Sequence, residues 1–426
     1  MQYTQLSRRS AGDKLNWEKQ YLTFIPVEDA VFSWAERATS GHLEYSINGG
    51  QTWVTIANGE STPTVTAGSK VMWRGNLKPN TNSNNGGIGT FSANGNYKAH
   101  GNTMSLLYYD DYYGSQLDSI HNRAFSHLFS EDTYVLSAPL LPATTLAEGC
   151  YGGMFKGCTS LTSAPELPAT TLAPGCYQGM FSGCTSLTTA PTILPATTLA
   201  NYCYNYMFNG CTSLTTAPAL PATTLTANCY YGMFNGCTSL TTAPALPATT
   251  LAMNCYYSMF NGCTSLTTAP ALPATTLTIN CYFVMFSGCT SLTTAPELPA
   301  TTLKSGCYRQ MFLGCRSLTT APELPATTLA KSCYQDMFNR CTSLTVAPEL
   351  PATTLVDSCY QQMFYRCTQL NYIKCLATDI SAIYCTTKWL NNVAATGTFV
   401  KAAGMEDWTT GASGIPSGWT VVDDNS

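Results

Sequence analysis

The sequence predicts an α/β solenoid preceded by a small antiparallel β-domain, and two features of the chain point to this fold class. The first is a cassette of 26 residues that recurs from about residue 124 to residue 400. The second is a cysteine-free stretch from residue 21 to about 115, in which apolar and polar residues alternate. A short unit cannot bury its apolar face alone, so copies of the cassette are expected to stack and to share one core.

The repeating cassette begins at a cysteine, and its first full copy, from Cys150 to Leu172, reads CYGGMFKGCTSLTSAPELPATTL. The frame returns every 26 residues, apart from one spacing of 27 where the extra residue is expected to bulge in a loop. Nine full copies begin at Cys150, Cys176, Cys203, Cys229, Cys255, Cys281, Cys307, Cys333 and Cys359. One imperfect copy precedes them and one follows, as expected for the capping units of a solenoid.

Each cassette is expected to contribute one short helix and one short strand. Cys150, Met154 and Cys158 recur at i, i+4 and i+8, which predicts one apolar stripe of an outer helix of about two turns. Leu161 to Pro165 is short and rich in Thr, which favours a strand of a parallel inner sheet. Proline lacks a donor, so it should end the ladder there.

The stretch before the repeats predicts a small antiparallel β-domain of alternating strands joined by turns. Asn48-Gly49-Gly50 stands between two of the predicted strands and is typical of a tight hairpin. The segment from Ser46 to Trp53 also resembles the Asp-box turn, with Asn in the Asp position. That resemblance implies a structural hairpin and no catalytic role.

The cassette CY-x2-MF-x-GCTSLTTAPELPATTL resembles the BspA-like leucine-rich repeats of surface proteins from anaerobic gut bacteria and their phages. The resemblance covers about residues 124 to 400, and it implies a right-handed leucine-rich-repeat solenoid with a parallel sheet, used in adhesion or recognition. We therefore predict four parts: an attachment or linker segment (1–20), a β-rich domain (21–118), the solenoid (119–400) and a C-terminal capping tail (401–426).

Twenty cysteines lie between Cys150 and Cys385, and eighteen of them form nine C-x7-C pairs. Two cysteines eight residues apart on a helix are about 12 Å apart along its axis, too far to share a metal ion or a disulfide. Disulfides between stacked coils would leave each sulfur with two equivalent neighbours and no unique partner. We expect the cysteines to be small buried apolar residues in two files, with a disulfide ladder and a metal site as the alternatives.

Composition and motifs exclude several classes of function. A net charge of −4 without a cluster of Lys and Arg gives no basis for nucleic-acid binding. No apolar run is long enough to insert into a membrane as a helix. No paired carboxylates, Ser-His set, phosphate loop or metal cluster stands out, so we expect no enzyme activity, no catalytic residues, no cofactor and no metal.

Candidate binding residues come from comparing the copies with one another. The two positions after Cys-Tyr vary most, and four successive copies carry an aromatic residue there, as binding surfaces often do. The candidate ligand-binding residues are Tyr206, Tyr231, Tyr257, Phe283 and Arg309. Incidental packing of exposed side chains is the alternative. A second candidate is the file of Thr hydroxyls on the inner sheet, such as Thr215 and Thr241.

These observations predict a non-catalytic protein that binds a surface glycan or a protein receptor. The first nine residues carry two arginines with no apolar stretch behind them, so no signal peptide is visible. This favours a phage tail-fibre or receptor-binding component of the virion, which would be expected to form a homotrimer. A bacterial cell-surface adhesin and a purely structural repeat protein are the alternatives.

Overall fold

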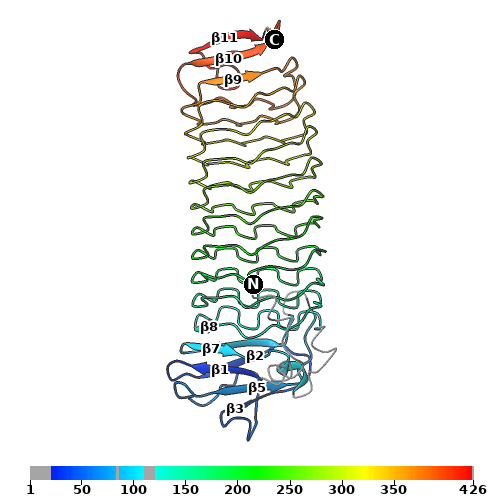
Figure 1. The fold of residues 1–426 in the computed structure, drawn as a ribbon, viewed down its shortest axis with the longest axis vertical. Helices are drawn as coiled ribbons and strands as arrows, with labels where there is room; N and C mark the ends of the chain where they lie inside the picture. The colour runs from blue at the N-terminus through cyan, green and yellow to red at the C-terminus, as the bar shows by residue number, and fades with distance from the viewer. Residues whose placement is uncertain (1–20, 83–85, 110–119, 425–426) are drawn as a thin grey trace. The chain divides into compact units, whose positions relative to one another are not determined.

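The computed structural model describes residues 21–82, 86–109 and 120–424. The chain forms two compact units, Met1–Ala196 and Thr197–Ser426. The first contains the β-rich region and the first coils of the repeat, and the second contains the remaining coils (Figure 1). The attachment segment expected at residues 1–20 lies outside the described residues.

The β-rich region of the first unit is built on one six-stranded sheet. Its strands, in spatial order, are β4 (Val54–Ile56), β3 (Leu43–Ser46), β5 (Val71–Gly75), β1 (Leu22–Pro26), β7 (Tyr97–His100) and β8 (Val135–Ser137). All neighbours are antiparallel except β7 and β8, which pair in parallel. A separate antiparallel pair is formed by β2 (Phe32–Glu36) and β6 (Gly89–Ala93). The antiparallel sheet predicted for this region is therefore confirmed, and it also includes β8 from the first part of the predicted solenoid.

Aromatic residues that alternate along these strands form the core of the β-rich region. The Phe24 ring lies 5.2 Å from Phe32, 5.5 Å from Trp73 and 4.9 Å from Tyr97, between ring centroids. The short helix α3 (Ser105–Tyr108) is tied to the sheet through Ser105, whose hydroxyl donates to the carbonyl oxygen of Trp73 at 2.9 Å. The same hydroxyl oxygen accepts from the Leu22 backbone N–H at 3.0 Å.

The turn between β3 and β4 is the predicted hairpin device. The Asn48 carboxamide oxygen accepts from the Thr52 backbone N–H at 3.0 Å, and its amide nitrogen donates to the Thr52 hydroxyl at 2.7 Å. The Ser46 hydroxyl accepts from the Gly50 backbone N–H at 2.9 Å. Asn therefore closes this loop through hydrogen bonds, as side chains of this type do in turns.

The outer helices predicted for the repeat are not formed, and this prediction is wrong. Gly149, Gly153 and Gly157 have φ of 58°, 59° and 74°, which no right-handed α-helix contains. Between them, alternate N–H groups bond within the coil, as Met154 N does to Tyr151 O at 3.2 Å. The others bond to the next coil, as Gly153 N does to Gln178 O at 2.8 Å. The segment is a chain of four-residue turns, which keeps the i, i+4, i+8 spacing of a helix.

The inner strand is also shorter than predicted in most coils. In the second unit, it is reduced to single parallel bridges between equivalent threonines, namely Thr216, Thr242, Thr268, Thr294 and Thr320. Full parallel strands form at the C-terminal end of this unit, where β10 (Gly397–Ala402) pairs with β9 (Tyr372–Cys375) and with β11 (Trp419–Asp424) (Figure 1). The C-terminal tail therefore adds the last strand, β11, to the ladder.

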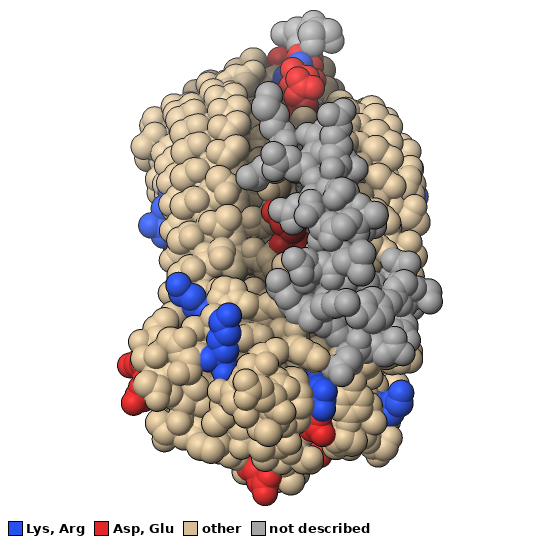
Figure 2. Space-filling view, turned by 60° about the horizontal axis from the view of Figure 1, so that its bottom comes forward, with Lys and Arg blue, Asp and Glu red and all other residues tan. Residues whose placement is uncertain are grey.

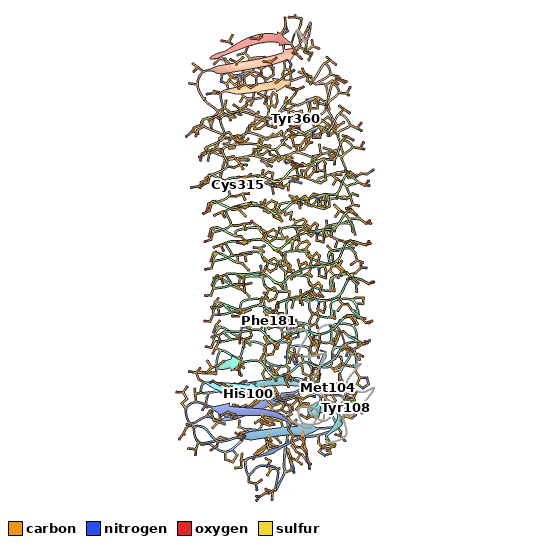
Figure 3. All side chains as sticks on the ribbon, viewed as in Figure 1. His100, Met104, Tyr108, Phe181, Cys315 and Tyr360 are labelled. Carbon is orange, nitrogen blue, oxygen red and sulfur yellow. The ribbon has the colours of Figure 1, made fainter. Side chains whose placement is uncertain are left out.

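The core of each coil consists of equivalent side chains that stack on those of the next coil (Figure 3). Phe260, for example, is fully buried, and its ring lies 5.6 Å from Phe234 and 5.6 Å from Phe286, between centroids. Tyr256 stacks in the same way on its neighbours in a second file. These contacts satisfy the expectation that the copies share one continuous core within a unit.

All twenty cysteines are buried free thiols, which confirms the prediction that they line the core. The second cysteine of most cassettes donates its thiol to a Phe carbonyl of the preceding coil, as Cys289 does to Phe260 O at 3.1 Å. Burial raises the pKa of the thiols, that of Cys315 to about 12, so they stay protonated at neutral pH.

Candidate binding surface

The structure brings all five predicted binding residues together in one continuous row on the second unit, called here the aromatic row. The rings of Tyr231 and Tyr257 are stacked, with centroids 4.3 Å apart and planes within 6°. Tyr206 meets Tyr231 edge to face at 5.1 Å, and Phe283 meets Tyr257 in the same manner at 4.7 Å. Arg309 completes the row, with its guanidinium carbon 5.1 Å from the Phe283 ring centroid.

The aromatic row is positioned by the turns of the coils. Tyr206 lies at a position where φ is 53°, and its ring reaches the neighbouring coil at Tyr231 and Gly232. Its ring rests on Gly232, where a Cβ would come within 2.4 Å of the Tyr206 Cε1 atom. Any side chain at residue 232 would therefore displace the Tyr206 ring. The sequence carries a signal for this contact, a glycine directly after Tyr231, but the comparison of copies did not identify Gly232 as part of the surface.

The row is partly exposed. The Tyr206 side chain is 36% exposed, and the other four side chains are half-buried. Burial, followed by hydrogen bonds with Tyr206 and Tyr257, raises the pKa of Tyr231, so its hydroxyl remains neutral at physiological pH. The rings cover part of one another's faces, so the surface offers partly exposed aromatic rings with tyrosine hydroxyls, and one cation at its end.

Arg309 differs from the rest of the row because it carries a charge into a half-buried position. Its Nε atom is buried and finds no hydrogen-bond partner among the described residues. The contact with Phe283 compensates part of this burial, since a guanidinium over an aromatic face is attracted by the ring quadrupole.

The sequence around the four aromatic residues of the row is uncharged. From Leu167 to Pro296 the sequence contains no Asp, Glu, Lys, Arg or His. Figure 2 shows one face of the molecule, on which charged side chains are few and uncharged residues dominate. A ligand of the row would therefore be recognised through stacking and neutral hydrogen bonds, with Arg309 as the charged contact.

The file of threonine hydroxyls, the second predicted candidate, is exposed. Thr215 and Thr241 are both exposed, and Thr293 donates its hydroxyl to Thr267 O of the previous coil at 3.3 Å. This last hydrogen bond uses a hydroxyl proton within the protein, which favours a role in holding neighbouring coils together.

Within the described residues, no group of three or more His, Cys, Asp or Glu side chains is placed to hold a metal ion. Over the same residues, no helix is both long and apolar enough to span a bilayer. The buried cysteines lie away from solvent, and their raised pKa is the reverse of what a thiolate nucleophile needs.

The stacked coils and their exposed aromatic row define a repeat solenoid of the kind that presents one extended surface. A family model described as "BspA type Leucine rich repeat region" matches residues 150–267 and 254–387, in six copies. The matched residues make up more than half of the chain, so the protein belongs to the BspA-type leucine-rich-repeat family. The repeats of this family suggest a surface or adhesion-type repeat protein. A search of curated protein sequences gave no match.

Proposed function

We propose that the protein is a non-catalytic recognition protein of an exterior surface, which binds a cell-surface glycan through the aromatic row. The observation that carries the proposal is the unbroken contact from Tyr206 through Phe283 to Arg309 across successive coils. The exposed parts of the aromatic rings can pack against the apolar C–H groups of sugar rings, and the tyrosine hydroxyls can bond to sugar hydroxyl groups. A protein receptor is the second candidate, because tyrosine and arginine also dominate protein interfaces.

Repetition supports this proposal further. Equivalent positions in stacked coils recur at about 4.8 Å, the spacing of neighbouring strands. A row built at this spacing meets a linear ligand at several points, so weak contacts add to a useful affinity.

The test is binding to a glycan array by the full chain and by a triple variant, Tyr206→Gly, Tyr231→Gln and Tyr257→Gln. Each replacement is the residue that other coils carry at the same position, as at Gly179, Gln335 and Gln361, so the fold should persist. The matched control is Tyr384→Ser, which removes an exposed tyrosine outside the row.

We expect the triple variant to lose glycan binding by roughly 100-fold, as loss of aromatic hot spots does, and Tyr384→Ser to retain it. Equal binding by all three proteins would refute a role for the row. Absence of binding to any glycan or cell surface would favour the purely structural alternative.

For the biological setting, we propose a virion fibre or receptor-binding component, with a bacterial surface adhesin as the alternative. A virion fibre is expected to be a homotrimer, so light scattering that shows a strict monomer would oppose it. Tail genes beside the coding gene would support it.

A further inference from the structure

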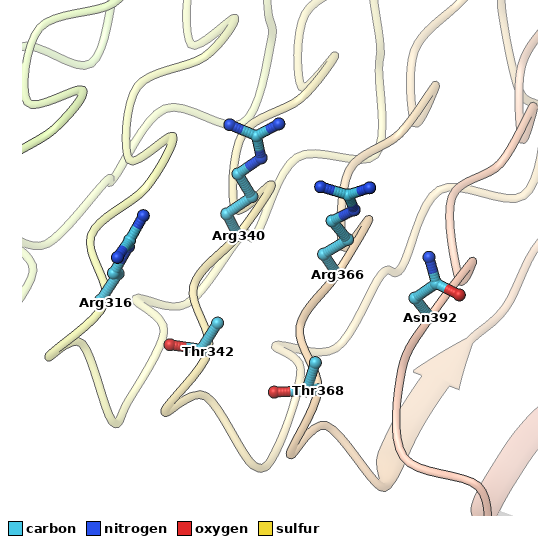
Figure 4. A pocket seen from close by; sticks show the side chains of 6 residues that line it. All are labelled: Arg316, Arg340, Thr342, Arg366, Thr368 and Asn392. Carbon is cyan, nitrogen blue, oxygen red and sulfur yellow. The ribbon is translucent and has the colours of Figure 1, made fainter.

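A groove on the C-terminal coils of the second unit is lined by arginines that the aromatic row does not use. It has a volume of about 600 Å³. The lining residues are Arg316, Arg340, Thr342, Arg366, Thr368 and Asn392. Arg340 and Arg366 project in the same direction from successive coils, with the two threonines beside them (Figure 4). None of the lining residues is acidic.

The arginines of this groove are exposed and carry uncompensated charge. Among the residues that the structure describes, no carboxylate forms an ion pair with Arg316, Arg340 or Arg366. Arg366 is partly oriented by Tyr365, whose ring centroid lies 5.1 Å from the guanidinium carbon. A guanidinium offers several donors in a fixed planar fork, which fits the oxygens of sulfate and carboxylate groups.

The backbone under two of these arginines is unfavourable for any side chain. At the position before the second cysteine, seven successive full copies have glycine, with φ from 72° to 79°. The next two copies have Arg340 and Arg366 at φ of 65° and 61°, and the C-terminal imperfect copy has Asn392 at 63°. Glycine is more favourable than any residue with a Cβ in this region, so the backbone does not favour the change from glycine to arginine in these two coils.

The threonines of the groove also have free hydroxyls, unlike those at the same position in the coils of the uncharged stretch. Thr264 and Thr290, at the same position in earlier coils, donate to a carbonyl of the preceding coil at 3.4 Å. Thr342 and Thr368 make no such bond to any described residue, so their hydroxyls are available to a ligand.

We propose that this groove binds a linear anionic polysaccharide, a chain whose sulfate or carboxylate groups face the arginines. Arg340 and Arg366 repeat at the coil spacing of about 4.8 Å, which suits a chain that runs along the stack of coils. The hydroxyls of Thr342 and Thr368 and the amide of Asn392 meet neutral sugar hydroxyls. This site shares no residue with the aromatic row. It would let the protein bind an anionic chain, whereas the row would bind neutral sugars.

The test measures binding of labelled dextran sulfate, polygalacturonate and neutral dextran to the full chain, by fluorescence anisotropy at low and physiological salt. We expect binding of one or both charged polymers, with affinity that falls steeply as salt rises, and no binding of neutral dextran. Comparison of the two charged polymers distinguishes sulfate from carboxylate recognition.

The decisive variant is Arg340→Gly with Arg366→Gly, which restores the glycine that the other coils carry. Its matched control is Lys304→Ala with Lys331→Ser, which removes two exposed positive charges from neighbouring coils outside the groove. We expect the groove variant to bind roughly 10- to 100-fold more weakly and the control to be unchanged.

Three results would overturn the proposal. The first is failure of the full chain to bind either charged polymer. The second is an equal loss in both double variants, which would mean that only net charge matters. The third is tighter binding of a single-stranded oligonucleotide of the same charge, which would assign the groove to nucleic acid.

Discussion

The coils from Cys203 to Pro296 and those from Glu297 to Asn392 share one core but have different surfaces. In both stretches the same Tyr, Phe, Met and Cys positions are buried and stacked. The first stretch has no charged side chain, and it bears most of the aromatic row. The second carries four arginines and the groove. The stacking of equivalent side chains constrains the interior, whereas the surface of each coil can vary independently.

The largest expected effect tests whether the two stretches have equivalent cores. Phe260→Ala in the uncharged stretch and Phe338→Ala in the charged stretch each remove a fully buried ring stacked on both sides. Each should lower the free energy of unfolding by about 3–5 kcal/mol, because a cavity replaces the ring. Urea unfolding measures both losses.

The thiols report the same effect locally. Cys289 donates to the carbonyl of residue 260, and Cys367 donates to that of residue 338. Mass spectrometry after thiol labelling should show faster reaction of Cys289 in the first variant and of Cys367 in the second. In the unsubstituted protein, all thiols should resist labelling until it unfolds. A clear difference between the two stability losses would mean that the cores are not equivalent.

The pH dependence of stability should come from outside the uncharged stretch, which has no carboxylate. Asp132, in the first unit, is 3% exposed and accepts a hydrogen bond from the Tyr97 hydroxyl at 2.9 Å. Burial raises the pKa of Asp132 from 3.8 to about 6, although hydrogen bonds from Tyr134 and Tyr97 lower it in part. The folded state therefore holds more protons than the unfolded state between these two values.

The free energy of unfolding should consequently fall as pH rises from about 4 to 6, by about 3 kcal/mol from this group. Asp132→Asn removes the titration, so its stability should depend less on pH over this window. Thermal unfolding at several pH values measures the difference between the two proteins. An identical pH dependence would show that Asp132 does not titrate in this window.

Much of this architecture was predictable from the sequence, because identical copies must occupy identical environments. The stacking, the buried cysteines and the clustering of Tyr231 and Tyr257 all follow from the repeat. The outer helix was predicted wrongly because apolar residues at i, i+4 and i+8 fit a chain of four-residue turns as well as a helix. The discriminating signal was glycine at every fourth position, at 149, 153 and 157, where a helix former would be expected.

The groove was missed for a related reason. Arg340 and Arg366 are unremarkable as isolated residues in a sequence of low charge. They become informative only when their position is known to have a positive φ, since glycine then is the expected residue. Comparison among copies shows which residues differ, and the backbone conformation shows which of these differences should lower the stability of the fold.

The smallest expected effect tests the backbone strain at this position directly. One variant adds a side chain there in the uncharged stretch, and the other removes one in the charged stretch. Gly262→Ala, in the uncharged stretch, places a Cβ at φ of 74° with only ordinary contacts around it. Its stability should fall by about 1 kcal/mol from backbone strain alone. Arg340→Gly relieves the same strain, although glycine also loosens the unfolded chain, so we expect a gain of about 0.5 kcal/mol. Urea unfolding of the two single variants gives opposite signs if the arginine is kept for binding rather than for stability. A loss of stability in Arg340→Gly would instead mean that the arginine stabilises the fold. Backbone strain would then no longer support the groove as a binding site.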